Sequence, residues 1–332
     1  MQNLKLLLCG FGQIGRMLFR TAARRPDLEV VAVLDSNPEL IGADAGIAAG
    51  GSAAGIPVAG RLGDLGVRPD AAVVTTVSDC AAAAGLIEEL ARAGIPVATT
   101  CEELAFPRPL HAEVADRLDA AARAGGVAVL GTGINPGFLM DYLVAALSGL
   151  TGEVRHVHVQ RFQNAAPRRP AFQKKIGAGQ TLAEFERNKA AGRLRHVGLP
   201  ESVYFVAAAL GWKLDRVTES IEPVVAEEAL QLPGAIPVAA GEARGVRQSG
   251  RGFIGEREVI HLEFLAAIGE PESFDRIHLE GTPELDSTIR GGVNGDQGTC
   301  AITLNAVRAV AGCGRTGLLT MLDLLPVTGR GW

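Results

Sequence analysis

Short apolar runs alternate with amphipathic stretches through the first 135 residues. Each run stops at Gly, Asp or Thr, and the runs are LKLLLCG, VVAVLD, AAVVTT, PVATT and VAVLG. The stretches between them, such as IGRMLFRTAARR and HAEVADRLDAAARAG, carry apolar residues at helical spacing. Strands that are apolar on both faces and separated by helices predict a parallel sheet covered on both sides. We therefore expect an α/β domain in this part of the chain.

The pattern changes after Tyr142. VRHVHVQRF alternates apolar with polar residues, and RGFIGEREVIHLEFLAAIG and FDRIHLEG resemble antiparallel strands with one wet face. TLAEFERNKAAG is typical of a capped helix, and TCAITLNAVRAVAG predicts another helix near the end. We expect a parallel-sheet domain over residues 1–138, an α+β domain over 139–298, and a C-terminal helix and tail over 299–332 that return to the first domain.

Composition narrows the class of protein. The 332 residues are 47% hydrophobic and 21% charged, as in soluble globular enzymes, and the net charge is −5 without a basic run that would indicate nucleic-acid binding. No apolar stretch reaches the roughly 20 residues of a membrane span, and the N-terminus lacks a signal peptide. Five scattered cysteines without metal-type spacing indicate a reduced, cytoplasmic protein with no metal site.

GFGQIGR supplies Gly10, Gly12 and Gly15 in the G-x-G-x-x-G pattern between a predicted strand and a predicted helix. Asp35 closes the next strand, about 20 residues on, where a ribose-binding acid is expected. Such a turn seats a pyrophosphate on the helix N-terminus, so the sequence predicts a Rossmann-type domain that binds NAD or NADP (NADH or NADPH). The expected contacts are Gly10, Phe11, Gly12, Gln13, Ile14, Gly15, Arg16, Asp35 and Ser36.

The phosphorylation state of the cofactor stays open. Asp35 can accept hydrogen bonds from a ribose 2′-hydroxyl, which favours NAD. Arg16, Ser36 and Asn37 lie nearby in the sequence pattern and could instead hold the 2′-phosphate of NADP.

The ends of the later strands should line the nicotinamide half of the cleft, because ligands gather at the carboxyl ends of a parallel sheet. These ends carry Thr75, Thr76 and, after the last apolar run, Asn135. Asn135 could offer its amide to the nicotinamide carboxamide or to substrate. Equally, Asn-Pro-Gly could simply form a turn.

Glu102 and Glu103 have two interpretations. Thr100-Cys101-Glu102-Glu103 fits a capping box, in which Glu103 would only satisfy backbone donors at a helix start. In the catalytic interpretation, one carboxylate pairs with an ammonium, takes its proton and stabilises an iminium cation.

Seven further motifs occur along the chain, in this order: TTCEELAFP, GTGINPGFLMD, RRPAFQKKIGAGQT, HVGLPES, ALGWKLDRVTESIEPVVAE, GGVNGDQGT and TGLLTMLDLLP. Together they resemble the 2,4-diaminopentanoate dehydrogenase family, which includes the native amine dehydrogenases and has a dihydrodipicolinate-reductase-like cofactor domain. The resemblance extends from the first strand almost to Pro326. It implies NAD(P)-dependent oxidative deamination of an amine, or reductive amination of a carbonyl compound with ammonia in reverse.

The resemblance also implies a homodimer and a second domain for substrate binding and dimerisation. The CEEL glutamate that handles ammonia in the family corresponds to Glu103 first and Glu102 second. Candidate substrate residues are Phe138, Asn164, Arg168, His196 and Thr299. This sequence has Asn164-Ala165 where family members usually show Asp-Ala, which weakens the case for a second ammonium on the substrate and favours a simpler amine or ketone over diaminopentanoate.

Two alternatives remain. A dihydrodipicolinate-type reductase would reduce a cyclic imine, but its His-His-Arg run is replaced here by VRHVHVQRF, in which His156 and His158 share one strand face. We interpret that pair as part of a polar face and not as metal ligands, since no third ligand is suitably spaced. A non-catalytic NAD(P)-binding sensor would need the glycine turn but not the CEEL, GTGINPGF and GGVNGD segments.

Overall fold

The computed structural model describes residues 3–194 and 196–329. The chain divides into a first unit, Met1–Phe138 with Asn294–Trp332, and a second unit, Leu139–Val293. The sequence placed the second boundary at 298/299, whereas in the structure it lies before helix α9 (Gly295–Gly312), whose N-cap is Asn294. No helix in the described ranges is long and apolar enough to span a membrane.

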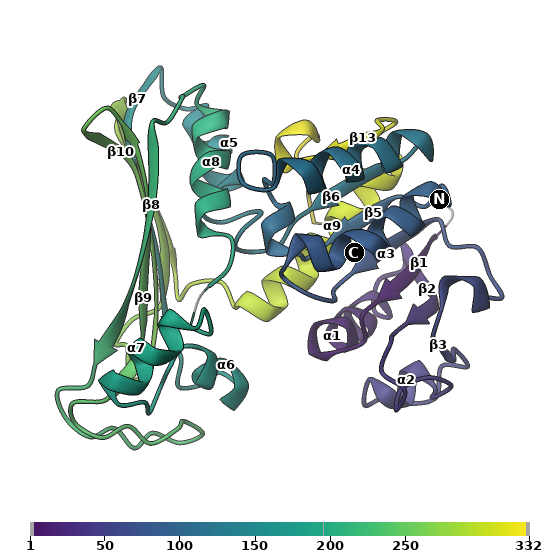
Figure 1. The fold of residues 1–332 in the computed structure, drawn as a ribbon, viewed down its shortest axis with the longest axis horizontal. Coiled ribbons are helices and arrows are strands. Elements are labelled where there is room, and N and C mark those ends of the chain that lie inside the picture. Colours follow the sequence, from purple (N-terminus) through teal and green to yellow (C-terminus); the bar gives the residue numbers. More distant parts are fainter. Residues whose placement is uncertain (1–2, 195, 330–332) are drawn as a thin grey trace. The chain divides into compact units, whose positions relative to one another are not determined.

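The sheet of the first unit is parallel throughout, in the order β13-β6-β5-β4-β1-β2-β3 (Figure 1). Its strands are β1 (Leu4–Cys9), β2 (Leu28–Leu34), β3 (Val58–Ala59), β4 (Ala71–Val74), β5 (Val97–Thr99), β6 (Ala128–Gly131) and β13 (Gly317–Leu319). The five apolar runs are confirmed as strands. The sequence pattern missed β3 and β13, because two or three residues are too few to show a period.

Helices cover both faces of this sheet. They are α1 (Gln13–Ala22), α2 (Ala45–Ala48), α3 (Cys80–Arg92), α4 (Ala112–Ala124) and α9, with short 3₁₀ turns η1 (Leu62–Asp64), η2 (Glu102–Leu104) and η3 (Met321–Asp323). Alternate strand residues enter opposite cores: Leu7 and Val74 pack with α3 and α4, whereas Leu8 and Val73 pack with α1 and α9. Each fully buried Leu or Val contributes about 1.5–3 kcal/mol, so two-sided burial explains why these strands are continuously apolar.

The turn between β1 and α1 requires glycine at two positions, because a side chain at either one would collide with backbone atoms. A Cβ on Gly15 would lie 2.0 Å from the carbonyl oxygen of Gly10, so only glycine lets α1 approach the turn this closely. Gly10 has φ +88°, and a Cβ there would meet the Thr75 carbonyl at 2.9 Å. The space around Gly12 is open: apart from its chain neighbours and the backbone of its own helix, no atom of the described residues lies within 4 Å of a Cβ position there.

The second unit is built on a six-stranded mixed sheet in the order β12-β11-β7-β10-β9-β8. Its strands are β7 (Glu153–Asn164), β8 (Arg216–Val225), β9 (Ala243–Ile254), β10 (Arg257–Ala267), β11 (Phe274–Thr282) and β12 (Leu285–Arg290). The expected antiparallel pairing is wrong for one pair, because β7 and β10 run parallel at the centre. Between β7 and β10 the chain forms three helices and the strands β8 and β9, and this long connection lets it enter β7 and β10 from the same end.

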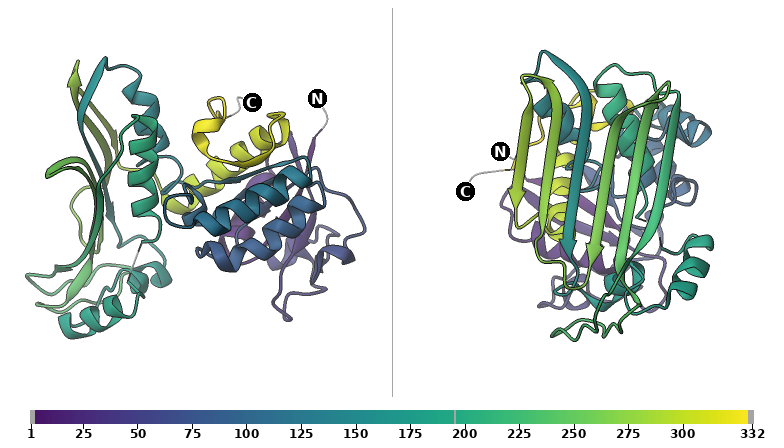
Figure 2. Two further views of the ribbon diagram at one scale, coloured as in Figure 1. Left: turned by 45° about the horizontal axis from the view of Figure 1, so that its top comes forward. Right: turned by 90° about the vertical axis from the view of Figure 1, so that its left-hand side faces the viewer.

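Helices of the second unit lie on one side of this sheet. They are α5 (Tyr142–Ser148), α6 (Pro170–Lys175), α7 (Leu182–Ala190) and α8 (Leu199–Ala209), of which α7 begins with the expected cap, a Thr181–Glu184 capping box. Helix α8 packs on β8, β9 and β10. In the right-hand view of Figure 2, the opposite face shows strands with no helix of the described chain in front of them.

The face without helices carries the two histidines that the sequence placed on one strand face. His156 lies 3.5 Å from Glu258 and 3.6 Å from Glu280, and the His158 ring stacks on His261 with centroids 4.9 Å apart. Val157 and Val159, the intervening residues of β7, are buried on the helical side. The alternation in VRHVHVQRF therefore separates an apolar core from a polar face of imidazoles and carboxylates.

Candidate active site

The candidate site of the first unit lies at the carboxyl ends of its parallel strands. The sheet order places β1 beside β4. Strands β2 and β3 follow β1 toward one edge of the sheet, and β5, β6 and β13 follow β4 toward the other edge. Ligands of open α/β sheets bind at such a switch point. The Thr75 hydroxyl, at the end of β4, donates a hydrogen bond of 2.9 Å to the Gly10 carbonyl and ties the two loops together. Thr76 follows and is exposed.

The glycine turn brings Asp35 to the start of α1. The Phe11 N–H donates to Asp35 Oδ2 at 2.5 Å, and the Asn37 N–H donates to Oδ1 at 2.7 Å. The carboxylate at the end of β2 therefore lies against the turn that G-x-G-x-x-G motifs use for a pyrophosphate, where a ribose-binding acid belongs.

The other predicted cofactor residues divide into backbone and side-chain candidates. The Phe11 ring is fully buried against Phe19, edge to face, so only its backbone faces the turn. Gln13 and Ile14 begin α1 behind Gly12, and that N-cap has no side-chain hydrogen bond. Arg16 Nε donates to the Phe11 carbonyl at 3.0 Å, whereas Ser36 is exposed. The open space at Gly12, next to a helix N-terminus, fits a phosphate.

Asn135 is buried after β6, with 7% of its surface exposed. Neither its Oδ1 nor its Nδ2 makes a hydrogen bond within the described ranges. The turn does not use this amide: the Asn135–Pro136 peptide is cis, and Gly137 has φ +118° with no room for a Cβ beside Gly133. A buried amide left without partners costs about 1–3 kcal/mol for each unsatisfied group, so a bound group that pairs with both atoms would be stabilised here.

Thr299, a predicted substrate residue, also lies near this loop. It belongs to the first turns of α9, and the Ile134 N–H donates to its hydroxyl at 3.4 Å. Phe138, the last residue of the first unit, is partly buried.

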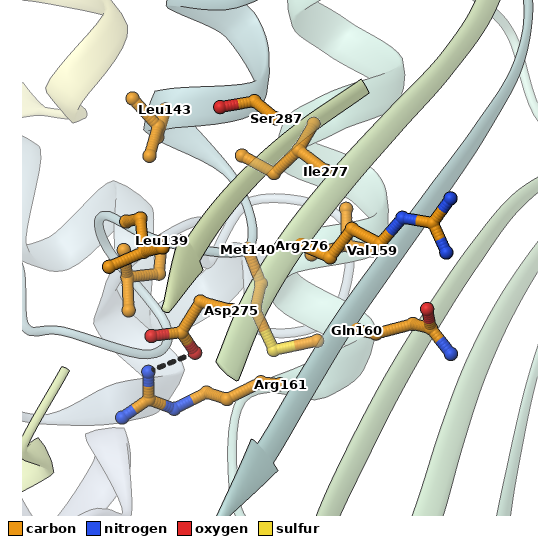
Figure 3. A pocket seen from close by; sticks show the side chains of 11 residues that line it. Leu139, Met140, Leu143, Val159, Gln160, Arg161, Asp275, Arg276, Ile277 and Ser287 are labelled. Atoms are coloured by element: carbon orange, nitrogen blue, oxygen red, sulfur yellow. Dashed lines mark hydrogen bonds and ion pairs between the residues drawn. The ribbon is translucent and has the colours of Figure 1, made fainter. Parts of the chain in front are cut away.

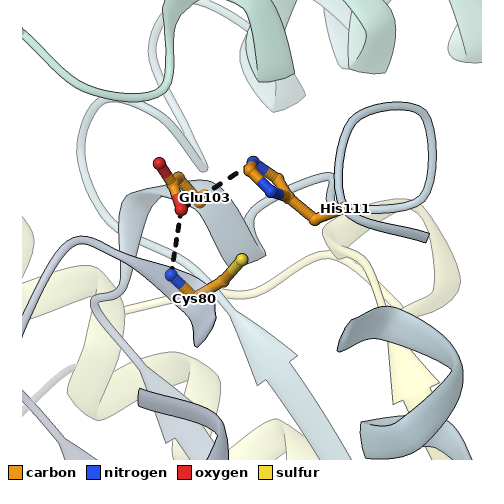
Figure 4. A group of neighbouring side chains, drawn as sticks. All are labelled: Cys80, Glu103 and His111. Carbon is orange, nitrogen blue, oxygen red and sulfur yellow. Dashed lines mark hydrogen bonds and ion pairs between the residues drawn. The ribbon is translucent and has the colours of Figure 1, made fainter. Parts of the chain in front are cut away.

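The capping-box interpretation of Glu103 is wrong. Turn η2 has Cys101 as its N-cap and no side-chain capping bond, and the Thr100 N–H donates to the Val74 carbonyl. Glu103 Oε2 accepts instead from the backbone N–H of Cys80, the first residue of α3, at 2.9 Å (Figure 4). The carboxylate therefore lies at the positive end of a different helix, which favours its negative charge.

Two residues beside Glu103 had no signal in the sequence. His111 Nε2 lies 3.8 Å from Glu103 Oε2, and the Cys80 sulfur lies in the same cluster (Figure 4). Burial, and after it the Glu103 carboxylate, raises the pKa of the Cys80 thiol to about 12. Glu102, by contrast, is partly buried, and its carboxylate makes no hydrogen bond or ion pair in the part of the chain that the structure describes.

His196 belongs to a polar network in the second unit. Its backbone N–H and carbonyl bond to the Gln248 amide, which also donates to Glu219. Its ring packs on Phe264 with centroids 4.6 Å apart, and Nδ1 lies 3.1 Å from the Val197 carbonyl. Since a carbonyl only accepts, Nδ1 carries the proton and Nε2 is an acceptor. Burial, reinforced by nearby Lys175 and Arg161, lowers the pKa of His196 to about 3.

Asn164 and Arg168 lie together at the end of β7. Asn164 Oδ1 accepts from the Ala166 N–H at 2.9 Å, so this amide stabilises the turn that follows the strand. The Arg168 guanidinium lies 4.3 Å from the centroid of the Phe172 ring, a cation–π contact.

A small cavity beneath the second sheet contains a buried ion pair that sequence reasoning missed (Figure 3). Arg161 donates to Asp275 at 2.6 Å and to the Val293 carbonyl, while the Val293 N–H donates to Asp275. Burial raises the pKa of Asp275, and the Arg161 guanidinium opposes that rise. The cavity volume of about 10 Å³ has room for at most about one water, so this is not a substrate site.

Comparison with known proteins identifies the class. Residues 4–102 match the N-terminal domain of dihydrodipicolinate reductase, which is an NAD(P)-binding domain, and residues 138–329 match the 2,4-diaminopentanoate dehydrogenase C-terminal domain. The chain is 30% identical to 2,4-diaminopentanoate dehydrogenase of Acetoanaerobium sticklandii, covering 98% of this chain and 94% of that protein. It is 24% identical to an amine dehydrogenase of Streptomyces virginiae, covering 97% and 96%.

The fold agrees with these matches. The amine dehydrogenase structure from Mycobacterium smegmatis superposes with a TM-score of 0.85 at 22% identity, over 99% of this chain and 98% of that one. The protein is thus a dehydrogenase that acts on amine groups and carries an NAD(P)-binding domain. It belongs to the 2,4-diaminopentanoate dehydrogenase family. The expected fold class and family are confirmed, and membership in a dehydrogenase family argues against the non-catalytic sensor.

The environment of His196 predicts a histidine that stays neutral in mild acid. Its folded pKa of about 3 lies below the ordinary value of 6.5, so only the unfolded chain gains a proton between these values. Stability from this residue is complete above pH 6.5 and falls as the pH drops toward 3. We expect the His196 ring signals in NMR, assigned by their loss in His196→Gln, not to titrate near pH 6.5. A midpoint close to that pH would contradict the burial argument.

Proposed function

We propose that the protein catalyses NAD(P)H-dependent reductive amination of a small ketone or aldehyde with ammonia, and the reverse oxidative deamination. The observation that carries this proposal is the Glu103 carboxylate, held by the Cys80 N–H at the carboxyl edge of the NAD(P)-binding sheet. A positioned carboxylate can hold an ammonium ion and take up its proton, which suits chemistry on amines.

The cofactor groups fit the residues at this edge. The open space at Gly12 and the N-terminus of α1 would hold the pyrophosphate, and Asp35 would accept from the ribose hydroxyls. Both NAD and NADP remain in the proposal, because Arg16 and Ser36 lie close enough in the chain to meet a 2′-phosphate. When bound, the nicotinamide supplies hydride to the reacting carbon or accepts it in the reverse direction.

The buried Asn135 amide would orient the nicotinamide. Its donor and acceptor, which make no hydrogen bond in the described ranges, match the acceptor and donor of a carboxamide. Turn η2 packs directly against the end of β6, since a Cβ on Gly131 would lie 2.1 Å from the Leu104 carbonyl oxygen. Loops that carry Asn135 and Glu103 are therefore neighbours, which supports roles in one reaction.

Glu103 would perform the proton transfers. In the amination direction, its carboxylate holds ammonia as ammonium, accepts the proton as nitrogen attacks the carbonyl carbon, and stabilises the iminium cation that forms after water leaves. General acid–base catalysis of this kind contributes about 10²–10⁴-fold to a rate. Fixing the base in place adds to this by reducing the entropy cost of the encounter.

The substrate that we favour is a simple carbonyl compound or monoamine. Asn164 replaces the acid that would pair with a second ammonium, and its oxygen is committed to the Ala166 N–H. Phe138, Arg168, His196 and Thr299 remain predicted substrate residues, with neutral His196 as a hydrogen-bond acceptor through Nε2. The homodimer and the cytoplasmic location likewise remain predictions.

The reaction is tested by NADH and NADPH oxidation with a panel of small ketones and aldehydes, each assayed with and without concentrated ammonium at alkaline pH. We expect oxidation that requires ammonium, because the iminium is the hydride acceptor. Oxidation without ammonium would show a carbonyl reductase instead. No oxidation under either condition would favour reduction of a cyclic imine.

Two neighbouring substitutions test the carboxylate assignment. Glu103→Gln keeps an oxygen that can accept from the Cys80 N–H but removes the charge, so the fold should survive while kcat/KM falls by about 10²–10⁴. Glu102→Gln, the matched control, should retain most of the activity. Cofactor affinity by fluorescence titration should be unchanged in both. The reverse order of activities would transfer the role to Glu102.

Substituting Asn135 tests the nicotinamide contact. Asn135→Ala leaves Pro136 and Gly137 to form the turn and removes two unsatisfied buried groups, so thermal stability without cofactor should not fall. Loss of two hydrogen bonds to the cofactor, about 0.5–1.5 kcal/mol each, should lower NAD(P)H affinity or kcat by about tenfold or more. Unchanged affinity and rate would remove Asn135 from the cofactor site.

A further inference from the structure

Three metal-ligating side chains converge at the start of α3. They come from separate elements: Cys80 is the first residue of α3, Glu103 lies in η2, and His111 precedes α4. One sulfur, one carboxylate oxygen and one imidazole nitrogen all lie within 4.8 Å of one another (Figure 4). The proposed amine chemistry uses only the carboxylate of this group, so it does not explain the convergence of the other two.

The donor set matches that of a zinc site, and its spacing comes close to that of one. Thiolate, imidazole and carboxylate are the ligands that Zn²⁺ takes in proteins, at bond lengths of about 2.0–2.3 Å in tetrahedral geometry. Two ligand atoms in such a tetrahedron lie roughly 3.3–3.8 Å apart, and His111 Nε2 lies 3.8 Å from Glu103 Oε2. Movements on the order of 1 Å would complete the geometry.

The surroundings add two features of metal sites. The Cys80 N–H already donates to Glu103 Oε2, and such an outer hydrogen bond orients a ligating carboxylate. The Cys80 side chain is buried, whereas 27% of the His111 side chain is exposed, which provides an entry path for an ion. Binding of the ion displaces the proton of the Cys80 thiol to solvent. The resulting thiolate and the Glu103 carboxylate would together neutralise a divalent ion, so its burial leaves no uncompensated charge.

We propose that Cys80, Glu103 and His111 form a binding site for a thiophilic divalent cation of the Zn²⁺ class, and that the bound ion inhibits the enzyme by occupying Glu103. The inhibitory half rests on the proposed role of Glu103 in amine chemistry. The binding half rests on the geometry alone. Three protein ligands leave a fourth position for water. Mg²⁺, which prefers oxygen ligands, is excluded by the sulfur and nitrogen donors.

Binding is tested with Co²⁺, which replaces Zn²⁺ and gives a thiolate-to-metal charge-transfer absorption. We expect the wild-type protein to bind one Co²⁺ per chain with this absorption and to release it to added Zn²⁺. Cys80→Ser should lose the absorption, and Cys313→Ser, a control at the partly exposed cysteine after α9, should keep it. His111→Gln should weaken binding by more than the roughly 10–100-fold that loss of an outer-shell partner costs.

The site is refuted if wild type shows no thiolate absorption, or if Cys80→Ser retains it. Circular dichroism and thermal unfolding of both variants identify a folding defect, and His111→Gln tests the site independently of the cysteine.

Inhibition is tested in the deamination direction, without added ammonium, because ammonia itself binds Zn²⁺ in solution. Zn²⁺ should inhibit the wild type and Cys313→Ser, while Cys80→Ser should need at least about tenfold more Zn²⁺ for equal inhibition. Mg²⁺ should have no effect. Binding of Co²⁺ without any inhibition by Zn²⁺ would overturn the inhibitory half and the catalytic assignment of Glu103 together. The Co²⁺ experiment does not depend on enzyme activity. A failure of the proposed amination reaction is therefore distinguishable from a failure of the proposed metal site.

Discussion

The parallel alignment of the strands in the first unit is the constraint on which the candidate site depends. Because β1, β4, β5 and β6 run in one direction, their following loops share one edge of the sheet. Buried apolar side chains on both faces hold the strands in this register. Several residues of these loops are themselves buried, Leu104 and Asn135 among them, and from these positions the loops present amides, hydroxyls and carboxylates at the edge. Thr75, Glu103 and Asn135 reach the same edge for this reason alone.

Glu103 shows how one interaction can serve structure and chemistry together. The Cys80 N–H is one of the donors that a helix start leaves without an intrahelical partner, and the carboxylate satisfies it at 2.9 Å. The helix gains a cap, and the carboxylate gains a fixed position with its charge favoured by the helix dipole. A base that is held in this way loses little entropy when it binds a reactant, which is what acid–base catalysis needs.

A buried ion pair, Arg161–Asp275, holds elements of the second unit together. Arg161 and Asp275 are both desolvated, and each would be costly alone. Their mutual hydrogen bonds and those to Val293 compensate this cost and attach the last residue of the unit to its sheet. Family membership then explains the type of reaction, whereas these contacts explain how this chain holds its own elements in place.

The sequence by itself determined the elements whose signal is local. Two-sided apolar runs specified the strands of the first sheet, and G-x-G-x-x-G between a strand and a helix specified the turn, because burial period and backbone sterics act between near neighbours. Asp35 could be predicted despite its distance, because the motif has a known spacing to its ribose-binding acid. Only the tertiary structure decided which distant groups meet. Cys80 lies 23 residues from Glu103 in sequence, and no motif links them. The local capping box was wrong because the Thr100 N–H pairs with the Val74 carbonyl and Glu103 accepts from a donor on another helix. The parallel pairing of β7 with β10 has the same origin, since long-range pairing depends on the path of the intervening chain.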